Sequence, residues 1–452
     1  MRDRLIDALK GAEGYVEIRV ERREGTEISF RGKLLERVSS TVDMGGFIRA
    51  LLPGKGWGVV SFNSLEGLKS KVKEAISLSK NLIMEEPIEL YPTQPVEIES
   101  DARLIDDFRT HKLEEKKSLA ESYNEIILCS RDIIDSQLLY TDGFKTYWYA
   151  NTEGTYIKKE RGDGLLLLNA IAKDSGSVQM AHEVITSRKG FSELTKREEL
   201  AKRVAELASN LLRAKPVKKG VYTTVLDPHL AGVFIHEAFG HLSEADHIYE
   251  NPRARELMKL GRKVGSKILN VIDDGSLPDL RGSIYYDDEG VKCRETYLIR
   301  EGVLTGRLHS RQTAKKMGEE PTGNARAQDY TFPPIVRMTN TYIENGDTPF
   351  EDMIRGIKDG IYACKAYGGE TMLENFSFSA GYGYMIRDGK IEELVRDIVL
   401  QGNLFETLSN IDAIGDDFQW LPGGTCGKGG QLAPVGIGSP HIRIKGVIIG
   451  GR

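Results

Sequence analysis

The stretch Asp227-Pro-His-Leu-Ala-Gly-Val-Phe-Ile-His-Glu-Ala-Phe-Gly-His241 joins a helix start to an apolar run that ends in two histidines and a glutamate. Asp227 offers a side-chain acceptor at the N-cap and Pro228 suits the first turn, so the segment predicts a helix. Two histidines around an acid in so apolar a run indicate a metal site. Glu237 would lie near the metal without binding it and would polarise an attacking water.

The spacing of the two histidines, His236 and His241, constrains this helix. Residues five apart in a regular helix point about 140° away from each other, so both rings could not reach one ion. Two remedies exist, a π-bulge or a break of the helix at Gly240, where glycine accepts dihedral angles that other residues resist. The sequence therefore predicts an interruption between Phe239 and His241.

A third ligand is expected, because catalytic zinc usually takes three protein ligands and a water. His247 lies six residues after the second histidine, and Glu244 and Asp246 are further candidates. The other nominee is Cys426, in a glycine-rich run that allows the backbone to approach closely, where a metal would hold the thiol as thiolate. Spacing alone leaves the choice open.

Composition narrows the class of protein. The chain has 452 residues, more than a single core usually serves, and a net charge of -5 without the basic excess of a nucleic-acid-binding surface. Its four cysteines form no CxxC pair, which favours a reducing, cytoplasmic setting. The longest apolar stretch, near residues 164–172, is far shorter than the roughly 20 residues of a membrane span. We expect neither a nucleic-acid partner nor a membrane.

The pattern of the chain predicts an α+β fold in two parts. Residues 1–215 should form an N-terminal α/β-mixed region with amphipathic helices on a sheet, and residues 216–452 a β-rich domain that carries the metal-binding helix. A proline-containing, acidic connector is expected near residues 84–110. Within 137–184, short strands are expected between glycine turns at 141–143, 151–154 and 161–164.

The motif His236-Glu-Ala-Phe-Gly-His241, together with the late run Thr425-Cys-Gly-Lys-Gly-Gly-Gln-Leu-Ala-Pro-Val-Gly436, resembles the TldD/TldE family, also called PmbA/TldD or modulators of DNA gyrase. Supporting stretches lie at 273–276, 288–290, 322–326 and 337–340. In that family the TldD-type subunit keeps the histidine motif and the cysteine, whereas the TldE-type subunit lacks them. The chain is therefore similar to the catalytic, TldD-type subunit.

The resemblance implies a zinc-dependent peptidase with His236, His241 and Cys426 as ligands and Glu237 as general base acting on a zinc-activated water. It also implies unfolded or flexible peptide substrates and a TldE-like partner subunit or a homo-oligomer. The alternative is a regulatory or interaction subunit of the gyrase-modulator type with a structural metal. A fourth ligand, for which His247 is the candidate, would favour that alternative. The roles of Glu244 and Asp246 stay open.

Overall fold

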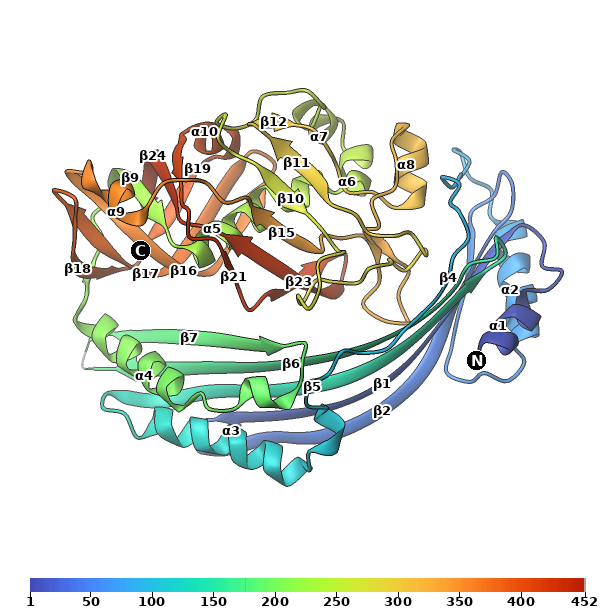
Figure 1. The fold of residues 1–452 in the computed structure, drawn as a ribbon, viewed down its shortest axis with the longest axis horizontal. Helices are drawn as coiled ribbons and strands as arrows, with labels where there is room; N and C mark the ends of the chain where they lie inside the picture. Colours follow the sequence, from blue (N-terminus) through green and yellow to red (C-terminus); the bar gives the residue numbers. More distant parts are fainter. Residues whose placement is uncertain (175, 451–452) are drawn as a thin grey trace.

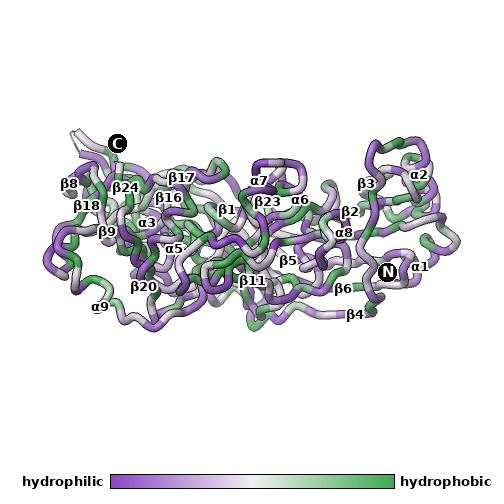
Figure 2. The backbone as a smooth tube through the Cα atoms, turned by 90° about the horizontal axis from the view of Figure 1, so that it is seen from above, coloured by the Kyte–Doolittle hydropathy of each residue, from purple (hydrophilic) through white to green (hydrophobic). Residues whose placement is uncertain are grey.

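The computed structural model describes residues 1–174 and 176–450, which form an α+β fold. A long, curved N-terminal sheet holds the C-terminal half of the chain on its concave side (Figure 1). In the view at right angles, helices α1 (Arg2–Leu9) and α2 (Leu68–Asn81) lie at one end of an elongated molecule and the last strand, β24 (Ile442–Gly450), lies at the other (Figure 2).

The N-terminal sheet consists of long antiparallel strands with one short parallel strand at its edge. Its strands are β1 (Tyr15–Arg31), β2 (Leu34–Leu51), β3 (Trp57–Phe62), β4 (Glu97–Ser100), β5 (Ile133–Asn151), β6 (Tyr156–Lys173) and β7 (Val178–Ser187). They follow the order β3-β2-β1-β5-β6-β4, with β7 also paired to β6. Strand β4 lies inside the segment expected as a connector and pairs in parallel with β6.

Two of the expected glycine turns are wrong. The turn at 151–154 joins β5 to β6, but Gly143 and Gly164 lie inside these strands and pair with Asp163 and Asp142. A Cβ on Gly164 would come within 2.6 Å of the Phe108 ring, so glycine here makes room for the segment that crosses the sheet. The strands are consequently much longer than the sequence indicates.

Helices cover the two ends of the outer face of this sheet. α1 and α2 pack over one end, on an apolar core that includes Val16, Ile18 and Val20 of β1. Helices α3 (Leu113–Leu128) and α4 (Glu198–Arg213) pack over the other end, on a second core. The 3-10 turns η1 (Phe108–Thr110) and η2 (Phe191–Leu194) precede these two helices.

The concave face of the sheet is lined with charged residues that the C-terminal half buries. Glu17, Arg19 and Glu21 alternate with the apolar residues of β1 and are at most 2% exposed. Arg49 donates to Glu17 at 2.6 Å and to Glu289 of the C-terminal half at 3.0 Å. Paired charges therefore join the two halves of the chain.

The C-terminal half is built on two further sheets and a hairpin of short strands. One sheet contains β10 (Val271–Asp273), β11 (Thr296–Arg300), β12 (Val303–Leu304), β15 (Asn340–Ile343), β21 (Gln419–Trp420), β22 (Gly424–Lys428) and β23 (Gln431–Ser439). The other contains β8 (Lys215–Pro216), β9 (Gly220–Leu226), β16 (Asp359–Met372), β17 (Asn375–Arg387), β18 (Lys390–Arg396), β19 (Val399–Asn403), β20 (Ile411–Ile414) and β24. Strands β13 (Ala325–Arg326) and β14 (Ile335–Val336) form the hairpin.

Helix α5 (Pro228–Ile235) contacts strands of both C-terminal sheets and is almost entirely buried. The remaining helices are α6 (Ala245–Glu250), α7 (Pro252–Leu257), α8 (Arg311–Met317), α9 (Phe350–Arg355) and α10 (Leu404–Ser409). Among the helices that the structure describes, none is long and apolar enough to cross a membrane. The division of the chain into 1–215 and 216–452 remains a proposal, and the distribution of strands among the sheets is compatible with it.

Candidate metal centre

The start of the motif helix follows the sequence prediction. β9 ends at Leu226, and the Asp227 carboxylate then accepts from the backbone N–H of Leu230 as the N-cap of α5. The same carboxylate accepts from the N–H of Lys365 on β16, which fixes the helix to the neighbouring strand. The helix is thus held at the point where its first turn leaves the sheet.

The predicted interruption of this helix is present as a π-helical turn, His236–Gly240, followed by the 3-10 turn His241–Ser243. The extra residue of the π-turn brings the rings of His236 and His241 to 5.5 Å between centroids, nearly perpendicular to each other. Gly240 itself keeps helical dihedral angles, φ -57° and ψ -49°. Glycine is needed there for space, because a Cβ would meet the Met338 sulfur within 2.1 Å.

Cys426 reaches the histidines from the hairpin of β22 and β23. Gly429 and Gly430 form its two-residue turn with φ of 57° and 73°, values that L-residues resist and that a type I′ turn requires. Arg337, which is 1% exposed, donates to the Cys426 carbonyl at 2.5 Å and to the Gln431 carbonyl at 3.2 Å, one on each strand. The hairpin is therefore anchored behind the cysteine.

One potential ligand atom from each of His236, His241 and Cys426 lies within 4.8 Å of the other two. The Cys426 sulfur is 3.2 Å from Nε2 of His241. Nδ1 of His236 is buried without a hydrogen-bond partner among residues 1–174 and 176–450. An orphaned imidazole nitrogen beside a thiol and a second imidazole is a donor set that suits a zinc-type ion.

The electrostatics of the cluster also suit a cation. Burial raises the pKa of the Cys426 thiol, but hydrogen bonds and charge from His236 and His241 outweigh burial and lower this pKa to about 5. Burial lowers the pKa of His241, but Cys426 and Glu244 outweigh it and raise that pKa to about 10. Cys426 is thus a thiolate near neutral pH, which is the form that binds metals.

Glu244, whose role the sequence leaves open, holds His241 in place. Its Oε2 accepts from Nδ1 of His241 at 3.0 Å, and the side chain is 1% exposed. Burial raises the pKa of Glu244, but His241 and Lys428 outweigh burial and lower it, so the carboxylate stays charged. Since a carboxylate only accepts, Nδ1 carries the proton and Nε2 faces Cys426 with its lone pair once that nitrogen is deprotonated.

Lys428 and Arg337 also support this arrangement, and neither role was expected from the sequence. The Lys428 ammonium lies 3.1 Å from Glu244 and 2.7 Å from Asp246, so Asp246 contributes through Lys428. Lys428 is part of the glycine-rich run around Cys426, and Arg337 begins the stretch 337–340 that supports the family resemblance. His247 is exposed and lies outside the cluster that the described residues form.

Glu237 lies beside the cluster and is partly exposed. Its Oε2 is 3.7 Å from Nε2 of His241, and its side chain is 34% exposed. A partly exposed carboxylate beside the candidate ligands can meet both water and a substrate. This position suits an acid-base group, which must exchange protons with reactants.

Family models and similar proteins give the class of this protein. Models described as PmbA/TldA metallopeptidase match the chain as domain 1 at residues 16–79, central domain at 106–212 and C-terminal domain at 219–451. A metalloprotease of Synechocystis is 44% identical over 99% of this chain and 97% of its own length. A zinc metalloprotease TldD homolog of Saccharolobus solfataricus is 29% identical over 97% of this chain and 96% of its own.

Solved structures share the fold at lower identity. TldE from Thermococcus kodakarensis aligns over the full length of both chains with a TM-score of 0.79 and 20% identity. A protein described as a modulator of a DNA gyrase from Thermotoga maritima aligns over 98% of this chain and 99% of its own, with a TM-score of 0.77 and 23% identity. The family models and the curated relatives thus define the chain as a metalloprotease. The chain belongs to the PmbA/TldD metallopeptidase family.

Proposed function

We propose that this chain is a zinc-dependent peptidase that hydrolyses unfolded or flexible peptides, with His236, His241 and Cys426 as ligands and Glu237 as general base. The observation that carries the proposal is the cluster itself, three ligand atoms within 4.8 Å of one another beside a partly exposed carboxylate. The zinc named in the Saccharolobus relative adds support for the choice of ion. When bound there, zinc would act as a Lewis acid that polarises a carbonyl and makes water more acidic.

The residues of the chain supply the proton transfers. Glu237 accepts a proton from the water that attacks the scissile carbonyl and then delivers it to the nitrogen of the leaving amine. Its exposed fraction lets it reach both, and its place one residue after His236 keeps it next to the reacting carbonyl. Glu244 fixes the ring of His241 through Nδ1, so that Nε2 stays directed at the site.

Features next to the cluster favour an extended substrate. Among the described strands, β22 pairs only with β23, so the edge that carries Cys426 is free for main-chain hydrogen bonds with a peptide. A cavity of about 390 Å³ lies along α5 and is lined by His229, Val233 and residues 423–425 at the start of β22. A space of this size accepts side chains of a flexible chain and excludes a folded domain.

A partner subunit completes the proposal. The fold shared with a protein named TldE supports a TldE-like partner that covers the open side of the site, and a second copy of this chain is the other candidate. An interaction subunit with a structural metal is less well supported, because a structural zinc site is normally closed by four protein ligands and the described cluster has three.

The test is a comparison of Glu237→Ala with the control Glu256→Ala, whose side chain is 72% exposed on α7. We expect Glu237→Ala to keep the wild-type zinc content and to lose at least about 100-fold in peptide cleavage, because a general base contributes roughly that much. The control should match the wild type in both. Wild-type turnover by Glu237→Ala would refute the proposed mechanism.

The substrate and partner parts are tested with one polypeptide in folded and unfolded forms, with and without a TldE-type subunit. Cleavage should be restricted to the unfolded form and should rise when the partner is added. Comparable cleavage of a compact, stable domain would rule out the narrow site. Equal activity of the chain alone would remove the partner from the proposal.

A further inference from the structure

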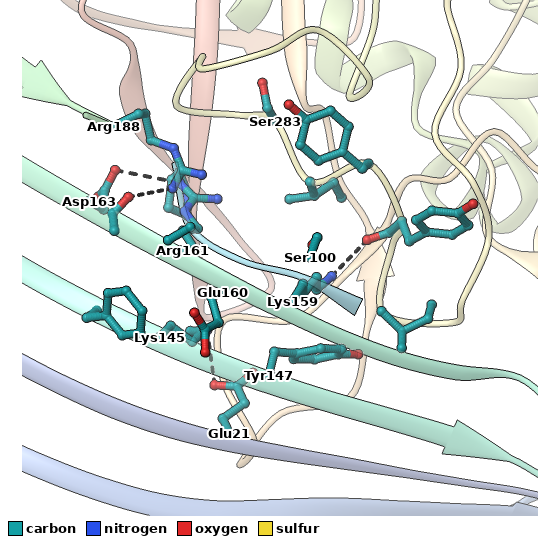
Figure 3. Close-up of a pocket in the computed structure, with 18 of the residues that line it drawn as sticks. Glu21, Ser100, Lys145, Tyr147, Lys159, Glu160, Arg161, Asp163, Arg188 and Ser283 are labelled. Atoms are coloured by element: carbon teal, nitrogen blue, oxygen red, sulfur yellow. Dashed lines mark hydrogen bonds and ion pairs between the residues drawn. The ribbon is translucent and has the colours of Figure 1, made fainter. Parts of the chain in front are cut away.

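A second cavity, of about 590 Å³, lies between the concave face of the N-terminal sheet and the loops of the C-terminal half. Strands β1, β5 and β6 form one wall, residues 98–103 border it, and residues 276–292 and 326–328 form the other wall. Figure 3 shows Arg161 and Arg188 converging beside Asp163 at one end, and Lys159 and Tyr147 toward the other. The metallopeptidase mechanism uses none of these residues.

The arginine end of the cavity carries more positive charge than its own acids neutralise. Arg161 lies 3.6 Å from Asp163, and Arg281 lies 3.3 Å from the same carboxylate. Arg188 joins this group without a salt bridge among the described residues, and its Nη1 donates to the Gly162 carbonyl at 2.7 Å. Three guanidinium groups thus share one carboxylate.

The pKa values of Arg188 and Arg161 reflect both the burial of these side chains and this crowding. Burial and the neighbouring Arg161 lower the pKa of Arg188 to about 9. Burial also lowers the pKa of Arg161, with the charge of Arg281 adding to it and Asp163 opposing it. Guanidinium groups stay protonated in proteins, so the two lowered pKa values report mainly the burial of positive charge, with repulsion between the arginines as a smaller cause.

Other charged residues of the cavity do not supply that counterion, because they are already paired. Lys145 lies 3.0 Å from Glu21, and Lys159 lies 3.5 Å from Asp288. Asp279, another acid that lines the cavity, lies 3.9 Å from the Lys189 ammonium. The excess is therefore local to the arginine end.

Four buried polar atoms of residues that line the cavity lack hydrogen-bond partners among the residues that the structure describes: Nε of Arg188, the hydroxyl of Tyr147, Oδ1 of Asp163 and Oε2 of Glu21. The two carboxylate oxygens lie within salt-bridge distance of Arg161 and Lys145, at 3.6 Å and 3.0 Å, so the two donors are the atoms left without any partner. Tyr147 is 2% exposed, so its hydroxyl has no access to bulk water. Buried donors without partners are unfavourable, and a ligand oxygen could accept from these two atoms only by displacing the atoms that now cover them. The walls also offer apolar surface from Phe144, Ile157, Ile284, Tyr285 and Tyr286.

We propose that this cavity binds a small organic oxyanion, whose carboxylate or phosphate group pairs with Arg161 and Arg188 and whose apolar body lies toward Tyr147. Guanidinium groups match the geometry of both oxyanions, because each presents two parallel N–H groups. The volume is in the range of small-molecule sites and exceeds that of a bare ion.

The site is separate from the metal centre. Pro434 of β23 lines the cavity and pairs with Thr425, whereas Cys426 pairs with Ala433. Successive residues of a strand point to opposite faces, so the cavity and the Cys426 side chain lie on opposite faces of the hairpin. Arg281 connects the two regions by donating to the Gly424 carbonyl at 2.8 Å.

The experiment measures binding of phenyl phosphate and of phenylacetate to the full-length chain by calorimetry and thermal unfolding at constant ionic strength, with benzyl alcohol as the uncharged control. We expect saturable binding of at least one anion and none of the alcohol. Arg161→Gln and Arg188→Gln should each weaken binding at least about tenfold, since a hydrogen bond to a charged group is worth that much. Arg131→Gln, at a side chain that is 89% exposed, should leave binding unchanged.

The two anions distinguish a phosphate site from a carboxylate site, and either result supports the proposal. Each titration is repeated on zinc-loaded and metal-free protein. Binding that requires the metal, equal binding by the arginine variants and the wild type, or no saturable binding of either anion would overturn the proposal. Arg188→Lys, which keeps the charge but loses the planar fork, provides a second variant if a glutamine variant fails to fold.

Discussion

Replacing Glu244 by glutamine removes a buried negative charge from the side chain that orients His241. The carboxylate lies 3.0 Å from Nδ1 of His241 and is 1% exposed, so no water competes for this hydrogen bond. Residues that hold a metal-binding histidine in this way typically affect metal affinity by about 10- to 100-fold. Glutamine can still accept a hydrogen bond from Nδ1 and keep the ring oriented, but it no longer makes the imidazole a better ligand.

We therefore expect Glu244→Gln to weaken zinc binding by about tenfold, or roughly 1.4 kcal/mol, and Glu244→Ala to approach a 100-fold loss because it also frees the ring. Folding should largely persist in the glutamine variant, since Lys428 keeps its contact with Asp246 at 2.7 Å. The assay is a competitive zinc titration against a chelator of known affinity, with circular dichroism as a check on folding.

The matched control is Glu250→Gln, an exposed glutamate at the end of the neighbouring helix α6. It should bind zinc as the wild type does. Wild-type zinc affinity in folded Glu244→Gln and Glu244→Ala would refute the assignment of Glu244 as the residue that positions His241.

Three further predictions concern the ligand, the π-turn and acid stability. Cys426→Ala should lose zinc, whereas His247→Ala should retain it. The measurement is zinc per chain by atomic absorption. If His247→Ala lost zinc and Cys426→Ala retained it, His247 would be the ligand in place of Cys426. Gly240→Ala should destabilise the fold by about 1–3 kcal/mol in denaturant titrations, because its Cβ would overlap the buried Met338 sulfur; unchanged stability would show that the side chain yields freely. Burial lowers the pKa of His229 to about 3, with Lys365 and a neighbouring histidine adding to it. As the pH drops below about 6.5, the unfolded chain therefore binds a proton at His229 before the folded chain does, and the stability of the fold decreases. His229→Gln removes this effect and should unfold at lower pH than the wild type. An unchanged midpoint pH of acid unfolding would contradict this.

Local signals in the sequence predicted the residue types at the site better than they predicted the residues that surround it. The Asp227-Pro228 helix start and the five-residue spacing of the histidines predict an N-capped helix and an interruption between Phe239 and His241. The glycines around Cys426 predict a close approach of the backbone there. These features depend on backbone geometry over a few residues, which residue type largely fixes. The choice between Cys426 and His247 did not follow from spacing and came from resemblance to a family.

Other features depended on neighbours that are distant in sequence. Gly143 and Gly164 have the composition of turns, yet they lie in long strands, and the Phe108 ring packs closely against Gly164. Glu17, Arg19 and Glu21 alternate like the solvent-facing side of a strand, yet the C-terminal half buries them. A sequence pattern records which face of a strand is apolar, but it carries no record of what covers the other face.

The same limit applies to the arrangement around the metal centre and to the anion cavity. Glu244 meets Lys428, and Arg161 meets Arg188, only because separate strands and helices bring them together. The sequence by itself determined the fold class, the motif helix and the residue types suited to a metal. Tertiary structure decided which charges face each other, because electrostatic interactions act through space and depend on distance and burial rather than on order along the chain.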